Sequence, residues 1–229
     1  MNQQLISIQK PKTPKNIVII LTKKLMAEYV YDHNGERLKK KEYKNNGENE
    51  TTYYIDDFVH TRLTNGTIFN ETYIKANGKI LAKIDNDGRV FYYHPDHLGS
   101  TSLVTNQTGD VVEEIFYYPF GKILVGNTGE RYLFTSKELD KDTDFYYYGS
   151  RYYDPKFSHF IQPDTIIQDI YNPQDLNRYA YVRNNPYKYV DPSGNVAVYF
   201  GGTTQAGFII GAGGSSGVVV SFSFSEGFQ

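Results

Sequence analysis

The chain has 229 residues, enough for one large or two small domains with a buried core. Its formal net charge of -2 gives no reason to expect nucleic acid or an anionic membrane as a partner. The sequence contains no cysteine, which excludes a disulfide framework and a thiolate metal site. It is rich in aromatic residues, with 22 Tyr and 14 Phe, and this bias favours β-strands. The composition therefore predicts a mainly β fold.

The N-terminal region contains one short apolar run, at Ile17–Leu21. This run is shorter than the roughly 7–15 residues of a signal-peptide core and far below the ~20 residues of a transmembrane helix. We therefore expect no signal peptide and no membrane span in this chain. Residues 1–26 carry several lysines around two prolines. We expect them to form a leader that is disordered, loosely attached, or left over from a longer reading frame that was truncated.

Turn signals recur from residue 27 to about residue 118. Asn-Gly and Asp-Gly pairs supply the positive φ values that tight β-hairpins require. These pairs are Asn34-Gly35, Asn46-Gly47, Asn65-Gly66, Asn77-Gly78 and Asp87-Gly88, and Thr108-Gly109 continues the spacing. The segments between them, such as residues 79–84 and 90–93, alternate in the way that strands do. The pattern predicts successive antiparallel hairpins that form a curved sheet.

Two short helices are predicted beyond the hairpins. Ser136 is a suitable N-cap for a helical turn over residues 137–139. Asn172 followed by Pro173 places a good N-cap residue before a proline at the first helical position. An apolar stripe that ends in a charge follows at helical spacing, and its members are Leu176, Tyr179, Ala180 and Arg183. This pattern predicts a short helical plug before the C-terminal segment.

The composition changes abruptly after Gly194. Residues 196–229 are rich in Gly, Ser and Val and hold a single ionisable side chain, Glu226. We therefore place a boundary at Asn195. The segment beyond it contains no nucleophile–base pair and no set of metal ligands, so we do not expect it to form a complete enzyme active site.

Four sequence blocks resemble one known family. They are YYHPDHLGST at 92–101, YYPFG at 117–121, FTSKELDKDTDFYYYGSRYYDPKFSHFIQPD at 134–164 and LNRYAYVRNNPYKYVDPSG at 176–194. In this order they resemble the RHS repeat-associated core, which ends the tyrosine-aspartate (YD) repeat shells of bacterial polymorphic toxins and related surface proteins. The segment YVYDHNGERLKKKE at 29–42 is similar to a YD repeat.

The resemblance implies a domain order and a role. Residues 27–118 correspond to YD-repeat-like hairpins, residues 119–195 to the core plug, and residues 196–229 to a variable, toxin-like segment. The chain would be the C-terminal part of a shell that closes around this segment and presents it, secreted or at the cell surface. The implied partners are the chain's own C-terminal segment as cargo, and a cognate immunity protein or the secretion machinery.

Many members of the resembled family cleave themselves after a D-P-x-G-L motif, with aspartates implicated in the chemistry. The matching residues here are 191–194, with Asn195 in place of the leucine, so we expect cleavage after Asn195 to be weak or absent. Hydrolysis by carboxylates needs two of them, one to activate water and one to donate a proton. The candidate catalytic residues are Asp191, its possible partners Asp175 and Asp164, and Arg178, which would orient or neutralise one of the carboxylates. The enzymatic activity implied is at most that of an aspartate-type autoprotease.

A purely structural interpretation of these residues stays open. Asp191-Pro192-Ser193-Gly194 also fits a type I turn, with Asp at the first position and Pro at the second. Asp175 near a helix N-terminus would interact favourably with the helix dipole. Turn formation and helix capping therefore explain both aspartates without catalysis.

Other candidate sites have simpler explanations. His94, Asp96 and His97 are close in sequence, but Pro95 prevents a helix that presents them on one face, so we expect no metal and no cofactor. Tyr146–Tyr148 and Tyr152-Tyr153 would suit a stacking platform for sugars, although core packing is the commoner role of such residues. Two alternative functions remain: a cell-surface adhesion or carbohydrate-binding module that contacts glycans, and a truncated remnant without independent activity.

Overall fold

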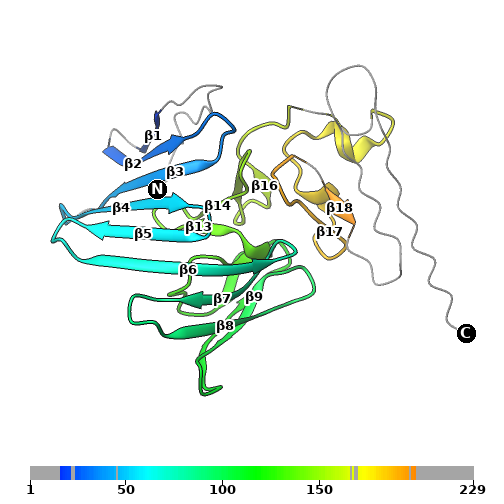
Figure 1. Cartoon of the computed structure of the whole chain (residues 1–229). Helices are drawn as coiled ribbons and strands as arrows, with labels where there is room; N and C mark the ends of the chain where they lie inside the picture. The colour runs from blue at the N-terminus through cyan, green and yellow to red at the C-terminus, as the bar shows by residue number, and fades with distance from the viewer. Residues whose placement is uncertain are drawn as a thin grey trace, which may run out of the picture.

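The computed structural model describes residues 16–21, 24–44, 46–165, 167, 170–195 and 197–199 (Figure 1). These residues form four antiparallel sheets and three 3-10 turns, without an α-helix among them. The prediction of a mainly β fold is thus confirmed. In the same described part of the chain, no helix is long and apolar enough to cross a membrane.

A ten-stranded meander forms the largest sheet, and its strands follow one another in chain order (Figure 1). Its strands are β1 (Asn16–Leu21), β2 (Lys24–Tyr31), β3 (Arg37–Tyr43), β4 (Asn49–Ile55), β5 (Phe58–Leu63), β6 (Ile68–Ala76), β7 (Lys79–Ile84), β8 (Val90–Pro95), β9 (Thr101–Thr105) and β10 (Val111–Glu114). The glycines of the predicted hairpin turns have positive φ values, for example 83° at Gly35 and 88° at Gly66. The predicted succession of antiparallel hairpins is therefore confirmed.

The sheet begins within the segment that we assigned to the leader. β1 pairs with β2, with Asn16 opposite Val30 and Ile19 opposite Ala27. β1 therefore lies upstream of residue 27, where we placed the start of the hairpins. Residues 1–15 of the leader lie outside the described residues.

Shorter elements follow the large sheet. They are β11 (Phe116–Tyr117), β12 (Ile123–Val125), η1 (Phe134–Ser136), β13 (Glu138–Asp140), β14 (Phe145–Tyr147), β15 (Tyr152–Asp154), β16 (His159–Phe160), η2 (Pro173–Leu176), η3 (Val182–Asn184), β17 (Tyr189–Val190) and β18 (Val198–Tyr199). β11 pairs with β12, β13 to β16 form a four-stranded sheet, and β17 pairs with β18. The last pair and η2 lie at the end of the molecule away from β1–β5 (Figure 1).

The predicted helical plug is wrong. Asn172 caps the turn as expected, accepting a hydrogen bond from the Gln174 N–H at 3.1 Å, but the turn ends at Leu176. Beyond it, the carbonyl groups bond to distant partners instead of the next helical turn: Arg178 O accepts from Asp164 N, and Tyr179 O accepts from Phe160 N. The apolar stripe is not buried either, since Leu176 is 55% exposed. Long-range pairing therefore overrides the local helical pattern.

The predicted helical turn at 137–139 is also wrong, because the 3-10 turn η1 precedes these residues and Glu138 begins strand β13. Ser136 has a φ of 57° and does not act as the N-cap. Its hydroxyl instead donates to the Gly99 carbonyl at 2.8 Å. Strand geometry points Glu138 toward Arg37, with an Nη2–Oε2 distance of 2.6 Å.

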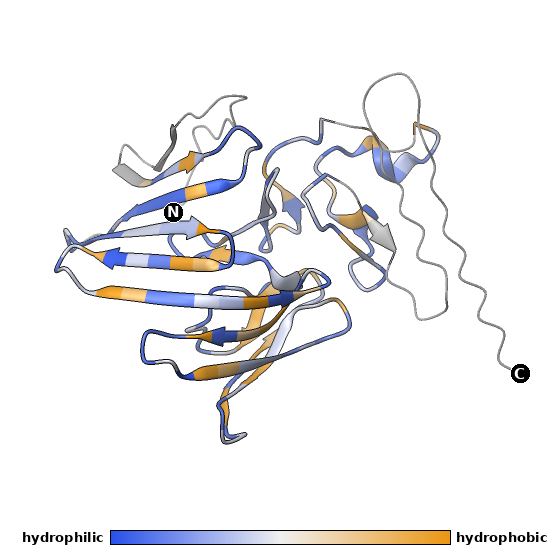
Figure 2. Cartoon of the chain, in the orientation of Figure 1, coloured by the Kyte–Doolittle hydropathy of each residue, from blue (hydrophilic) through white to orange (hydrophobic). Residues whose placement is uncertain are grey.

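Two kinds of packing hold the molecule together. Along β5, buried and more exposed residues alternate, and Val59 and Thr61 are the buried ones. Figure 2 shows that hydrophilic and hydrophobic residues are mixed along the strands of the large sheet. An aromatic cluster forms the core of the second half of the chain. In this cluster the rings of Tyr148, Phe160 and Tyr181 pack edge to face. Such pairs add about 0.5–1.5 kcal/mol each beyond area burial. Buried ion pairs connect the large sheet to β13, because Arg37 and Lys40 of β3 both contact Asp140.

Candidate functional site

The Asp191 carboxylate organises the turn that follows β17. Its Oδ1 accepts hydrogen bonds from the backbone N–H groups of Ser193, Gly194 and Asn195 at 3.1, 2.7 and 3.2 Å. Asp191 is buried, and Gly194 adopts a φ of 81°, which favours glycine. A Cβ at position 194 would lie 3.0 Å from Arg151 N. The turn-forming role of Asp191 is therefore part of the structure.

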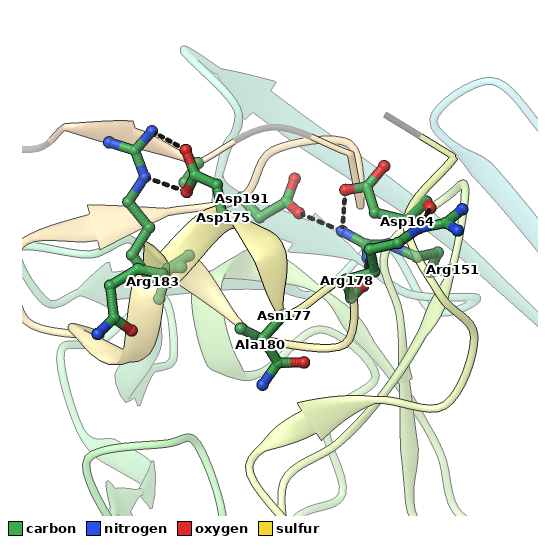
Figure 3. A pocket seen from close by; sticks show the side chains of 11 residues that line it. Arg151, Asp164, Asp175, Asn177, Arg178, Ala180, Arg183 and Asp191 are labelled. Atoms are coloured by element: carbon green, nitrogen blue, oxygen red, sulfur yellow. Dashed lines mark hydrogen bonds and ion pairs between the residues drawn. The ribbon is translucent and has the colours of Figure 1, made fainter. Parts of the chain in front are cut away.

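Arg151, which directly precedes β15, connects this turn to a second aspartate. Its Nη2 lies 2.9 Å from Asp164 Oδ2 and 3.6 Å from Asp191 Oδ2 (Figure 3). Its Nε donates a short hydrogen bond to the Gly194 carbonyl. The guanidinium stacks on the Phe160 ring, 3.7 Å from the centroid. One buried cation thus contacts two carboxylates and a backbone carbonyl of the DPSG turn.

The buried charge of Arg151 would be unfavourable without its two carboxylate partners. Burial lowers the pKa of Arg151, and the nearby Asp164 and Asp191 carboxylates act in the opposite direction. A buried charge is tolerated when it is paired and hydrogen-bonded. Arg151 meets this condition through both aspartates and the carbonyl groups of Gly194 and Arg178.

The structure separates the two candidate partners of Asp191. It brings Asp164 to Asp191 on the shared guanidinium. It places Asp175 in a bidentate pair with Arg183, with both nitrogen–oxygen distances at 2.6 Å (Figure 3). Arg178 contacts the backbone of the Asp164 residue rather than its carboxylate, since its Nε donates to the Asp164 carbonyl at 2.6 Å.

A small cavity of about 40 Å³ lies among these side chains. Its lining includes Arg151, Asp164, Asp175, Asp191 and Ala197. A cavity needs roughly 10–15 Å³ to hold a water molecule, and it needs polar partners. This cavity meets both conditions, and it therefore offers a place for a water molecule beside three aspartate carboxylates.

Arg151 and Arg183 are site residues that we did not predict from the sequence. Both act on carboxylates that lie 13 and 8 residues away in the chain, and only the fold pairs them. One signal was available for Arg151: a charged residue within a run of tyrosines that we expected to be buried. Such a residue needs a buried anion, which would have directed attention to the aspartates of the following block.

The aromatic runs are part of the core. Tyr146, Tyr148, Tyr152 and Tyr153 are each at most 3% exposed, and the ring of Tyr148 packs at right angles to that of Phe160. Core packing, the commoner role for these residues, is thus confirmed. A stacking platform for sugars does not form at these four positions, because their faces are covered.

The histidine segment forms a turn. Asp96 Oδ1 accepts from the N–H groups of Leu98 and Ser100 at 2.9 and 2.7 Å, and His94 contacts Thr105. Across the part of the chain that the structure describes, no group of three or more His, Asp or Glu residues is arranged to hold a metal ion.

The fold and site define a class of protein: a mainly antiparallel β protein in which a buried arginine holds the turn between β17 and β18. The sequence matches the Teneurin YD-shell family over residues 17–187. The chain belongs to this family of YD-repeat, or RHS, shells, as the four sequence blocks indicated.

Individual relatives are much longer than this chain. Salivary gland surface protein 1 of Aedes aegypti is 32% identical over 192 residues, covering 75% of this chain and 5% of that protein. The tRNA3(Ser)-specific nuclease WapA of Bacillus spizizenii is 29% identical over 182 residues, covering 75% of this chain and 8% of that protein. The structure of the Photorhabdus luminescens Tc holotoxin pore has a TM-score of 0.69 at 19% identity, covering 97% of this chain and 11% of that chain.

Proposed function

We propose that this chain is the C-terminal part of a YD-repeat shell that closes around its own C-terminal segment, and that it cuts itself after Asn195. The observation that carries the second part is the contact of Arg151 with Asp164, Asp191 and the Gly194 carbonyl. A pair of carboxylates beside a peptide segment is the arrangement that aspartate-type hydrolysis needs. Family membership supports the first part.

The proposed chemistry uses both carboxylates on one water molecule. One of Asp164 and Asp191 removes a proton from a water molecule in the small cavity, and the oxygen attacks the Asn195 carbonyl carbon. The other, which is protonated at the start of the step, donates its proton to the nitrogen of residue 196, and the peptide bond breaks. Arg151 keeps the two carboxylates together and fixes the Gly194 carbonyl, one residue before the bond that is cut. Asp175, neutralised by Arg183, supports the turn η2 and takes no part.

The domain division enters as part of this proposal. Residues 27–118 supply hairpins of the shell, residues 119–195 supply the core with the cutting turn, and residues 196–229 are the cargo. Because the chain spans 5% to 11% of the length of the relatives described above, further shell would have to complete the enclosure. An immunity protein or secretion machinery would act as partner, and the shell would work outside the cell or at its surface. Residues 200–229 lie outside the described residues.

An intact-mass measurement of the purified chain tests the proposal. Wild type should yield a large fragment ending at Asn195 and a small one beginning at Val196. Asp164→Asn should slow the cut on the order of 10²–10⁴-fold, because an amide is neither a general acid nor a general base. Asp175→Asn is the matched control, because Asp175 is a half-buried aspartate that lines the same cavity but pairs with a different arginine.

A second candidate, glycan binding, is supported by aromatic residues on the exposed face of the sheet. Tyr53 is 40% exposed, lies beside the His60 ring, and has Lys39 Nζ 5.5 Å from its ring centroid. His60 in turn contacts Asn70 at 2.7 Å. Exposed aromatic and amide groups in a row suit sugar binding. A glycan array with wild type and Tyr53→Ala would test it, and identical signals for the two would count against this face.

A further inference from the structure

Lys137 reaches the DPSG turn from the loop between η1 and β13. Its Nζ donates a hydrogen bond of 2.5 Å to the Pro192 carbonyl, 55 residues away in the chain. The same ammonium lies 5.3 Å from the ring centroid of Tyr148. The carbonyl that it contacts belongs to the residue directly after Asp191, so Lys137 and Arg151 hold the same short turn at two different carbonyl groups.

Lys137 is half-buried in the fold. Burial lowers the pKa of its ammonium; Asp191 and Glu36 act in the opposite direction, and Lys75 adds to the lowering. Among the described residues, Lys137 forms no ion pair. A perturbed lysine beside a candidate catalytic turn therefore suggests a functional reason for the charge.

A cavity of about 420 Å³ gives solvent access to this contact. Its lining includes Arg37, Lys75, Lys137, Tyr148, Pro192 and Ser193. Lys137 thus lies where the cavity meets the turn. Loss of its hydrogen bond would leave the Pro192 carbonyl facing water, and the turn would depend on its contacts with Asp191, Arg151 and Ser150.

We propose that Lys137 is a positioning residue of the self-cleaving turn. Its ammonium fixes the Pro192 carbonyl, and this keeps the N–H groups of residues 193–195 on Asp191 and the Gly194 carbonyl on Arg151. The predicted effect of Lys137 on the cleavage rate rests on the proposed self-cleavage. The predicted effect of Lys137 on the order of the turn does not depend on it. A misplacement of ~1 Å in a reacting geometry can cost about 100-fold in rate, so a single hydrogen bond in this place suffices to matter.

Two substitutions and one control test the role in the full chain. Lys137→Met removes the donor and the charge, and should slow the cut roughly 10–100-fold. It should also speed hydrogen exchange of the amides of residues 193–195. Lys137→Arg keeps a donor and a cation, and should restore most of the rate. Lys141→Met is the control, because Lys141 also donates to a backbone carbonyl, that of Thr128 at 2.9 Å, but away from the turn.

The pH profile separates positioning from general stability. Because burial lowers the Lys137 pKa, cutting and exchange protection in wild type should decline on the alkaline side at a lower pH than in Lys137→Arg. This comparison also decides the matter if Lys137→Met does not fold. Should wild type remain whole, self-cleavage fails, and the exchange data alone decide the positioning role. Equal exchange of residues 193–195 in Lys137→Met and Lys141→Met, or equal profiles for wild type and Lys137→Arg, would overturn the proposal.

Discussion

Arg37 of β3 and Asp140 of β13 are 103 residues apart in the chain and form a buried ion pair, with an Nη1–Oδ2 distance of 2.8 Å. Arg37 Nη2 also contacts Glu138 at 2.6 Å. This pair joins the large sheet to the four-stranded sheet, and so it couples the hairpins to the part of the chain that carries the candidate site.

Removing the arginine should strongly destabilise the fold. Arg37→Met leaves the buried Asp140 and Glu138 with fewer cations, and breaking a buried pair in this way costs about 3–5 kcal/mol. Urea unfolding should show this as a lower free energy of unfolding. Arg89→Met is a suitable comparison, since Arg89 pairs with Asp85 on the surface and is expected to contribute little. Equal effects of the two substitutions would argue against a coupling role for Arg37.

Acid should weaken the same connection. Burial by itself would raise the pKa of Glu138, but Arg37, Lys40 and Arg131 outweigh it and hold that pKa well below its usual range. A carboxyl with a lowered folded-state pKa contributes stability that is fully present above its unfolded pKa of about 4.3 and is lost as the pH falls further. Unfolding measured between about pH 5 and pH 2 should therefore show a steep fall in wild type. In Glu138→Gln the slope should be smaller, even though the variant is less stable at neutral pH.

Glycine at position 194 should be required both for its positive φ angle and for the lack of space for a Cβ. Gly66 and Gly194 have similar φ values of 88° and 81°, but a Cβ at Gly66 has open space while one at Gly194 approaches Arg151 N at 3.0 Å. Gly66→Ala should cost about 1–2 kcal/mol from backbone strain. Gly194→Ala should cost more in the same unfolding measurement and disturb the turn. The difference in unfolding free energy between the two variants measures the cost of placing a Cβ close to Arg151 N. Equal losses would mean that the turn at residue 194 shifts to make room at no cost.

The edge of the large sheet should make the isolated chain associate. Within the described residues, β10 pairs with β9 alone, and Val111 and Val112 on it are 63% and 48% exposed. Exposed apolar edge strands promote pairing between chains, and charged residues oppose it. Light scattering over a concentration series should show association of wild type, reduced by Val111→Lys. A wild-type monomer at high concentration would contradict this expectation.

Local signals in the sequence predicted the hairpins well because a turn depends on a few neighbouring residues. The glycine of Asn34-Gly35 adopts its positive φ wherever the flanking strands lie. The helix over residues 173–183 failed for the opposite reason, since the backbone of Arg178 and Tyr179 bonds to Asp164 and Phe160, and no local pattern shows these partners.

Part of the candidate site could likewise be predicted from local sequence, and part could not. The DPSG turn and Asp191 could be found from a motif, because the residues that form the turn are contiguous. The choice between Asp164 and Asp175 could not, since it depends on which arginine reaches which carboxylate in the folded chain. Arg151 donates to the Gly194 carbonyl 43 residues away, and Lys137 donates to the Pro192 carbonyl 55 residues away. No sequence motif or residue spacing indicates contacts over such separations.

The most direct test of the central claim is a time course of intact mass for newly synthesised chain, comparing wild type, Asn195→Leu, Asp164→Asn and Asp175→Asn. We predict a slow cut after Asn195 in wild type, a faster cut with leucine restored at 195, no measurable cut in Asp164→Asn, and a cut in Asp175→Asn at the wild-type rate. Chains that stay whole in both wild type and Asn195→Leu would contradict self-cleavage. Cutting that continues in Asp164→Asn but stops in Asp175→Asn would contradict the assignment of the Arg151-bound pair.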